Sequence, residues 1–358
     1  MLAVDRRCGA LTTPGLLDHI STADTVRDLD RLRALVGDRR LTYLGWSYGS
    51  MIGQTYANLF PRRVRAMVLD GIVDPVAALK DMEARISRDV SVVDGVFARF
   101  EELCEQAGPD RCALAGHGTS VKARVDAVLR RLRRGTIPAP TAEPPGPLTY
   151  AEALVGLFGA INGPGGWPDM AADLNQAADG DGSALATAGR VADLRASLVP
   201  SQAVHCADTP AGARPQDWPG VMARLERVSR LRGRLLGWWL WAPCTAWPTG
   251  HANASRYTGP WKRRTARPIV VIGNRFDPAT AYGNAQRVAR RLGSAVLLTL
   301  DGYGHTSDVD PSTCIRQAKT RYLTELVAPP RGTVCPADRL PFDPDYGEPL
   351  QVSARPGA

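Results

Sequence analysis

The chain has 358 residues, of which 44% are hydrophobic, and a formal net charge of +8. This length and composition are enough for about two globular domains with apolar cores. The positive charge comes from arginines scattered along the chain, and the densest run, residues 130–134, is typical of a solvated helix end and not of a nucleic-acid site. No apolar run reaches the roughly 20 residues that a membrane span requires.

The first part of the chain alternates helix and strand patterns. Residues 21–36 place apolar side chains at helical spacing between a serine cap and Gly37, which predicts a helix. Residues 41–44 and 64–69 are apolar runs of strand length, and a helix is predicted between them. This alternation is typical of an α/β protein with a parallel sheet.

A G-x-S-x-G pattern, Gly-Trp-Ser-Tyr-Gly at residues 45–49, lies between the first predicted strand and the helix that follows it. A sharp turn at this place exposes the serine hydroxyl and directs the next backbone N–H at a developing oxyanion. Ser47 is therefore the candidate nucleophile, and the N–H of Tyr48 is the candidate oxyanion donor.

The middle of the chain, residues 76–264, consists mainly of amphipathic helical stretches, with a proline-rich loop at 138–147. We expect it to form a helical cap that excludes water and limits the length of the substrate. Trp239 and Trp241, in an aromatic cluster of this cap, are candidates for lining a substrate pocket, although packing in the core is an alternative role.

Two strand patterns at 268–273 and 295–300 precede the remaining candidate catalytic residues. Asp277 follows the first strand and His305 follows the second, which completes the order Ser, Asp, His of serine hydrolases built on an α/β sheet. Asp74 and Asp301 are alternative positions for the acid. Asp277 is favoured because its loop follows the strand that directly precedes the strand leading to His305.

Several segments together carry a resemblance to a known family. They are residues 22–30, 45–49, 56–61 and 68–75 near the start, and 277–280, 304–306, 314–317 and 335–338 near the end. The chain resembles the tripeptidyl aminopeptidase branch of the secreted α/β-hydrolases, which are prolyl-aminopeptidase-like serine peptidases with a TAP-like carboxy-terminal module. The resemblance implies an extracellular exopeptidase that releases short peptides, such as tripeptides, from free amino termini and needs no cofactor.

An aminopeptidase also needs an anion for the ammonium group of its peptide substrate. Asp208 and Asp74 are candidates for this role, and either of them could instead be a capping or loop acid. An esterase or lipase would use the same catalytic residues with a different cap.

One part of the family pattern is absent from the sequence. Relatives carry about four strands and a Gly-Gly-Pro-Gly loop before the segment with which this chain begins, and that loop donates one oxyanion N–H. We therefore expect an α/β-hydrolase sheet that lacks its amino-terminal strands, and removal of one such donor typically costs about 2.7–4 kcal/mol of transition-state stabilisation. A catalytically impaired fragment is the corresponding alternative. From the charged residues near Met1 we also expect no signal peptide in this chain.

The expected organisation is a first core part at residues 1–75, the cap at 76–264, a second core part at 265–340 and a tail at 341–358. Nothing in the sequence indicates an oligomeric state.

The chain has seven cysteines, an odd number for a protein of secreted type. Local spacing suggests the pairs Cys104–Cys112, Cys206–Cys244 and Cys314–Cys335, which leaves Cys8 without a partner. The alternative is a set of reduced thiols in a cytosolic enzyme. The sequence has no C-x-x-C pair and no H-E-x-x-H motif, so we expect no metal site.

Overall fold

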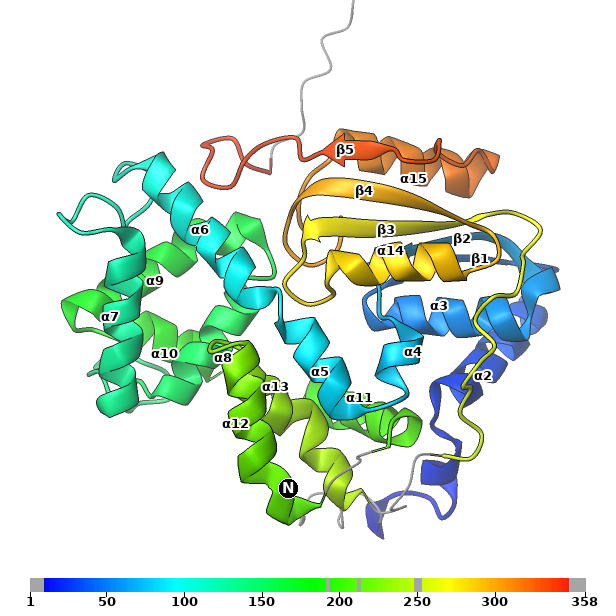
Figure 1. The fold of residues 1–358 in the computed structure, drawn as a ribbon, viewed down its shortest axis with the longest axis horizontal. Helices are drawn as coiled ribbons and strands as arrows, with labels where there is room; N and C mark the ends of the chain where they lie inside the picture. Colours follow the sequence, from blue (N-terminus) through cyan, green and yellow to red (C-terminus); the bar gives the residue numbers. More distant parts are fainter. Residues whose placement is uncertain (1–9, 191–193, 211–213, 248–252, 348–358) are drawn as a thin grey trace, which may run out of the picture.

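In the computed structural model, which describes residues 10–190, 194–210, 214–247 and 253–347, the chain folds around a five-stranded parallel sheet (Figure 1). The strands lie in the order β1-β2-β3-β4-β5, so each strand pairs with its neighbour in sequence. Their bounds are β1 Leu41–Trp46, β2 Val64–Asp70, β3 Ile269–Phe276, β4 Ala295–Tyr303 and β5 Val334–Pro336. The predicted α/β class is confirmed.

Helices cover both faces of the sheet because the strands carry apolar side chains on both sides. Met67 and Leu69 of β2 pack with α2 (Thr22–Leu35), α3 (Tyr48–Leu59) and α14 (Tyr282–Arg291). Ala66 and Val68 alternate with them and pack on the other face with α15 (Thr313–Glu325). Two short 3-10 turns are η1 (Leu16–His19), which contacts α11 (Leu194–Asp208) of the middle region, and η2 (Pro61–Arg63), which contacts α3.

The helix predicted at 21–36 is α2, and it begins where the sequence indicates. The Ser21 hydroxyl accepts a hydrogen bond from the Asp24 N–H, and the Asp24 carboxylate accepts one from the Ser21 N–H. This capping box satisfies two of the N–H groups that a helix start leaves without partners.

The chain between β2 and β3 is mainly helical, as predicted. Its longer helices are α5 Met82–Val90, α6 Val93–Ala107, α7 Val121–Arg134, α8 Tyr150–Ala160, α9 Trp167–Asp179, α11 Leu194–Asp208 and α12 Trp218–Val228. Its shorter elements are α4 Pro75–Ala78, η3 Pro164–Gly166, α10 Ser183–Gly189, η4 Pro215–Asp217, α13 Gly233–Leu236, η5 Gly237–Trp241 and η6 Pro243–Ala246. These elements, hereafter the cap, lie to the left of and below the sheet in Figure 1 and share one large apolar core.

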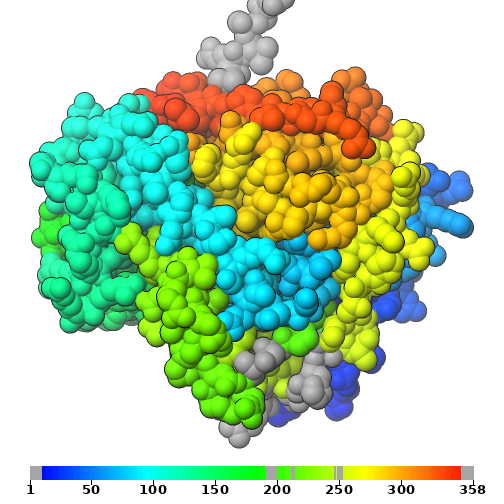
Figure 2. Space-filling view, in the orientation of Figure 1, coloured from blue at the N-terminus to red at the C-terminus, as the bar shows by residue number. Residues whose placement is uncertain are grey.

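The described part of the tail joins the cap to the sheet. Phe342 is buried in the apolar core of the cap, with its ring centroid 6.0 Å from that of Phe100 on α6. Figure 2 shows this carboxy-terminal segment, in red, lying across the cap and the strands.

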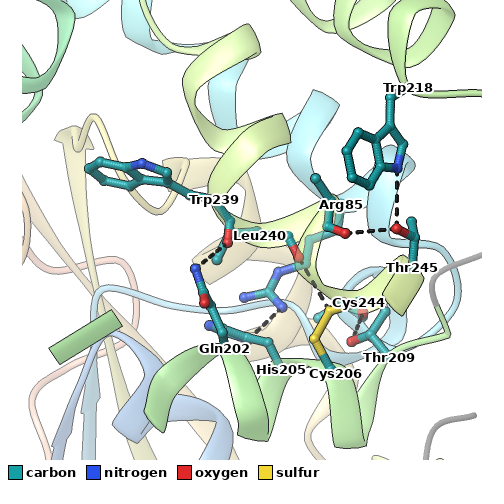
Figure 3. Close-up of a disulfide and its surroundings, with 12 residues drawn as sticks. Arg85, Gln202, His205, Cys206, Thr209, Trp218, Trp239, Leu240, Cys244 and Thr245 are labelled. Carbon is teal, nitrogen blue, oxygen red and sulfur yellow. Dashed lines mark hydrogen bonds between the residues drawn. A yellow bond between two sulfur atoms is a disulfide. The ribbon is translucent and has the colours of Figure 1, made fainter. Parts of the chain in front are cut away.

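Three disulfides join Cys104 to Cys112, Cys206 to Cys244 and Cys314 to Cys335, the pairs that the spacing suggested. The second links α11 to η6 inside the cap (Figure 3). Cys8 lies outside the described residues. Over the described ranges, no helix is long and apolar enough to cross a membrane, and no group of three or more His, Cys, Asp or Glu residues could hold a metal ion.

Candidate active site

Ser47 occupies the sharp turn between β1 and α3. Its backbone has φ 53° and ψ −119°, and its N–H donates a hydrogen bond to the Asp70 carbonyl at 2.9 Å. A positive φ is uncommon for a residue with a side chain and is often retained at functional sites. The turn also requires Gly45, because a Cβ there would lie 2.5 Å from the Gly49 carbonyl oxygen. This geometry is a strained strand-to-helix turn of the kind that a nucleophile elbow requires.

Asp277 and His305 follow β3 and β4, and the structure brings them into contact. The His305 Nδ1 atom lies 3.1 Å from each carboxylate oxygen of Asp277. The buried carboxylate also accepts hydrogen bonds from the N–H groups of Ala279 and Thr280 and from the Thr280 hydroxyl. An ionised carboxylate at Nδ1 holds the proton on that nitrogen, so Nε2 is left as the basic atom of the ring.

The charges of the pair are coupled. Burial alone would raise the pKa of Asp277, but the His305 imidazole and the hydrogen bonds from Thr280 hold that pKa below its ordinary value. Burial alone would lower the pKa of His305, but the Asp277 carboxylate outweighs burial and raises that pKa above its ordinary value. The pair is therefore arranged to stabilise an imidazolium next to a carboxylate.

The residues after β2 lie between Ser47 and His305. Gly71 follows Asp70 in a left-handed conformation, and a Cβ on it would lie 3.2 Å from the His305 Cε1 atom. On the elbow side, the Ser50 hydroxyl donates a hydrogen bond to the Gly71 carbonyl at 3.3 Å. The elbow and the histidine loop thus flank Gly71 at the carboxyl ends of the parallel strands, where α/β enzymes bind their substrates.

Two contacts that hold the histidine loop were not predicted. The buried Asp70 carboxylate accepts hydrogen bonds from the Ser307 N–H and hydroxyl, and burial raises the Asp70 pKa to about 6. The His305 N–H donates to the Asn162 carbonyl, at the end of α8, at 2.7 Å. The polar Ser307 beside the histidine was the only sequence signal for the first contact. No signal pointed to the second, because it depends on how the cap lies on the sheet.

Two family matches agree with this fold. Residues 3–106 match the alpha/beta hydrolase fold family, and residues 236–335 match the family described as TAP-like protein. The two matches cover separate parts of the chain, which is therefore an α/β-hydrolase with a TAP-like carboxy-terminal part.

This TAP-like hydrolase is similar to several curated proteins. Serine protease Hip1 of Mycobacterium tuberculosis is 31% identical over 350 residues, covering 92% of this chain and 64% of Hip1. Tripeptidyl aminopeptidase of Streptomyces lividans is 27% identical over 344 residues, covering 91% of this chain and 60% of that protein. Carboxylesterase B of Mycobacterium tuberculosis is 31% identical over 330 residues, covering 89% of this chain and 61% of that protein. The chain thus spans less than two thirds of the length of these relatives.

The structure corrects the prediction that Asp208 binds the ammonium group of a substrate. Asp208 is 2% exposed, and its carboxylate accepts hydrogen bonds from the Thr22 N–H at 3.0 Å, the Thr22 hydroxyl and the Tyr48 hydroxyl at 2.7 Å. These donors occupy the carboxylate. In the TAP-like hydrolase, Asp208 instead ties α11 of the cap to α2 and to the elbow.

Asp74 is also unsuited to either role predicted for it. It is buried, it caps α4, and its carboxylate forms ion pairs with Arg287 and Arg291 of α14 at 3.0 and 2.6 Å. Burial would raise its pKa, but these two arginines lower it. The other alternative acid, Asp301, is exposed and paired with Arg275 at 3.0 Å. Neither acid contacts His305, so Asp277 is the acid that the structure places beside the histidine.

The two predicted tryptophans of the cap differ in their surroundings. Trp241 is buried in the core of the cap, which corrects its assignment to a substrate pocket and favours the packing role. Trp239 is partly buried and packs edge-on against Phe158, with ring centroids 5.2 Å apart. Its carbonyl accepts a hydrogen bond from Gln202 at 3.0 Å (Figure 3). A role for Trp239 in substrate binding stays a prediction.

Proposed function

We propose that the protein is a serine hydrolase in which Ser47 is the nucleophile, His305 the general base and Asp277 the acid that orients the base. The observation that carries the proposal is the contact of His305 Nδ1 with both oxygens of the buried Asp277, next to the loop that supports the Ser47 elbow. The same arrangement of roles operates in serine hydrolases of unrelated folds.

In the proposed reaction, His305 Nε2 accepts the hydroxyl proton of Ser47 as the oxygen attacks the substrate carbonyl. Asp277 stabilises the imidazolium, which then protonates the leaving group as an acyl-enzyme forms. Water attacks the acyl-enzyme with His305 again as the base. Tyr48 is the first residue of α3, where backbone N–H groups have no partner within the helix, and its N–H is the proposed oxyanion donor.

For the substrate, we propose peptides with a free amino terminus, from which the enzyme releases short peptides. Relatives named serine protease and tripeptidyl aminopeptidase support this class. Three disulfides among the described residues support the proposal that the enzyme acts outside the cell. Ester hydrolysis is the second candidate, and it is favoured by the relative named carboxylesterase B.

A fluorophosphonate probe tests the catalytic assignment, because it forms a covalent bond only with an activated serine. We expect labelling of the wild-type chain at Ser47, found by peptide mapping, and loss of labelling in Ser47→Ala and His305→Ala. Ser91→Ala, at an exposed serine, is the matched control and keeps the labelling. A folded chain that is not labelled would instead be the catalytically impaired form of the hydrolase.

Chromogenic substrates then separate the two substrate classes. A tripeptide anilide with a free amino terminus, its amino-acetylated form and a short-chain nitrophenyl ester are compared on the same preparation. The aminopeptidase proposal expects at least a tenfold preference for the free over the acetylated tripeptide. Equal rates on the two tripeptides, or turnover of the ester alone, would contradict it.

A further inference from the structure

Arg232, in the turn between α12 and α13, is a buried cation of the cap. It is 4% exposed, and its guanidinium carbon lies 3.8 Å from the ring centroid of Phe158. Apolar side chains from α6 and α8 surround the adjoining cavity. Within the described ranges, no carboxylate lies within ion-pair distance of Arg232. A buried charge without a paired carboxylate is costly, so its presence calls for a functional explanation.

The guanidinium of Arg232 reaches the loop that carries Asp277. Its Nη1 group donates a hydrogen bond to the carbonyl of Pro278, the residue after Asp277. Its Nε atom is buried and has no hydrogen-bond partner within the described ranges. Phe158, which the guanidinium covers, belongs to α8, and the Asn162 carbonyl just beyond α8 accepts the His305 N–H. Arg232 therefore contacts the loop of Asp277 directly, and it packs on the helix whose end contacts the loop of His305.

The charges around these groups come from several elements. His305 faces Asp277 after β3, Asp70 at the end of β2, and Arg232. Arg232 faces Asp277 and Asp89 of α5, and Asp89 itself lies 3.8 Å from the Arg85 Nε atom. The two carboxylates near His305 favour its protonated form, and Arg232 is the cation that opposes them.

We propose that Arg232 is a positioning residue for the Asp277–His305 pair: it fixes the Pro278 turn from the cap, and it places a buried cation beside the loop that carries Asp277. A base must be neutral before it can accept the Ser47 proton, so the cation extends the working range of His305 to lower pH. This inference rests on the proposed function in that His305 acts as the base. The coupling between the two charges can nevertheless be measured without any activity.

The test uses Arg232→Met, which removes the charge and leaves an apolar side chain over Phe158, and Arg232→Lys, which keeps a cation. Arg234→Met is the matched control, because Arg234 lies two residues away, has a 52% exposed side chain and pairs with Glu226 at 3.5 Å. NMR follows the titration of the imidazole Cε1–H group, which is assigned to His305 by comparison with His305→Ala. The pH dependence of fluorophosphonate labelling is measured in parallel.

We expect the His305 titration midpoint in Arg232→Met to rise by roughly one pH unit, which is a tenfold loss of neutral imidazole on the acid side. The pH at which labelling falls to half on the acid side rises by the same amount. Arg232→Lys and Arg234→Met keep the wild-type midpoint. A merely structural role of Arg232 would change thermal stability without moving the midpoint.

A folded Arg232→Met chain whose His305 titrates as in the wild type would overturn the inference. If this variant does not fold, Arg232→Gln carries the same test, because its neutral amide keeps a polar side chain at this position while the charge is absent. A chain that is never labelled, but whose His305 midpoint still rises in Arg232→Met, supports the coupling and refutes the hydrolase proposal.

Discussion

In the proposed mechanism, the protonation state of His305 sets the pH at which Ser47 can react. Burial lowers the pKa of His305, but the Asp277 carboxylate raises it by a larger amount, so the net pKa lies above the ordinary value of 6.5. Only the neutral imidazole accepts a proton, and activity should therefore fall as the pH drops through this raised pKa. We expect kcat/KM for a nitrophenyl ester to reach half its maximum above pH 6.5. A half-maximum below pH 6.5 would contradict this coupling of the two side chains.

Asp277→Asn tests the acid directly. An amide beside Nδ1 cannot hold the imidazole in the correct tautomer or stabilise the imidazolium, so we expect kcat to fall by roughly 10⁴-fold. The matched control is Asp301→Asn, at the exposed acid near the end of β4, which should change kcat by less than twofold. The rates are measured on the ester and on the free tripeptide anilide. Equal effects of the two substitutions would remove Asp277 from the catalytic assignment.

The sequence was sufficient to propose Ser47, Asp277 and His305, because each follows a strand pattern and their order in the chain is characteristic. The sequence could not exclude Asp208 as the anion that binds the ammonium group of the substrate. The donors that occupy its carboxylate come from Thr22, 186 positions away, and Tyr48, 160 positions away. No local pattern encodes such distant partners. Arg232 was missed for the same reason, because its contacts with Phe158 and Pro278 depend on the packing of the cap.

At the scale of the elements, Asp208 holds α11 against the start of α2. Its carboxylate is buried and accepts three hydrogen bonds from Thr22 and Tyr48. In Asp208→Asn the new NH₂ group would face donors, and a buried donor without an acceptor typically costs about 1–3 kcal/mol. We expect the free energy of unfolding, measured by urea denaturation with tryptophan fluorescence, to fall by that amount.

The control for Asp208 is Asp179→Asn, because Asp179 has a 62% exposed side chain and an ion pair with Arg124 at the surface of the cap. Exposed ion pairs contribute roughly 0–1 kcal/mol, so this variant should remain close to the wild type. If Asp208→Asn were equally stable, the junction between α11 and α2 would not depend on this carboxylate.

The strands were predicted from apolar runs, which placed their ends too early. The run at 268–273 continues as β3 to Phe276, and the run at 295–300 continues as β4 to Tyr303. Asn274 explains the first difference, because its amide donates hydrogen bonds to the Tyr303 and Gly304 carbonyls at 2.7 and 2.9 Å. A polar side chain with such partners can be buried in a strand, whereas the pattern indicates a loop. The short β5 was not predicted, because its three residues form no apolar run.

At the scale of the whole molecule, the cap and the sheet have separate apolar cores. The cluster that unites the cap helices contains few residues from the strands, and two further clusters lie on the two faces of the sheet. The division into residues 1–75, 76–264, 265–340 and 341–358 stays a prediction, and Phe342 of the predicted tail lies in the apolar core of the cap. Polar contacts such as Asp208 with Thr22 and Arg232 with Pro278 connect the cap to the sheet. We therefore expect the loss of such a contact to change the geometry of the site while both apolar cores stay folded.

The outer edge of β1 has consequences for the molecule as a whole. Among the described residues, no strand pairs with this edge, and strand edges of this kind promote association between chains. The adjoining α2 helix adds apolar surface, since Leu35 is 82% exposed and Val36, which follows the helix, 73%. We expect the purified chain to self-associate increasingly with concentration in sedimentation velocity.

Leu35→Glu with Val36→Lys should reduce this association, because charges beside a strand edge oppose docking of a second chain. Val228→Lys is the matched control, since Val228 is 39% exposed on α12 of the cap, away from β1. The double substitution should shift the distribution toward the monomer, whereas the control should behave as the wild type does. A wild-type chain that sediments as a monomer at all concentrations would show that the β1 edge is protected in solution. An equal effect of Val228→Lys would assign the association to general surface hydrophobicity instead.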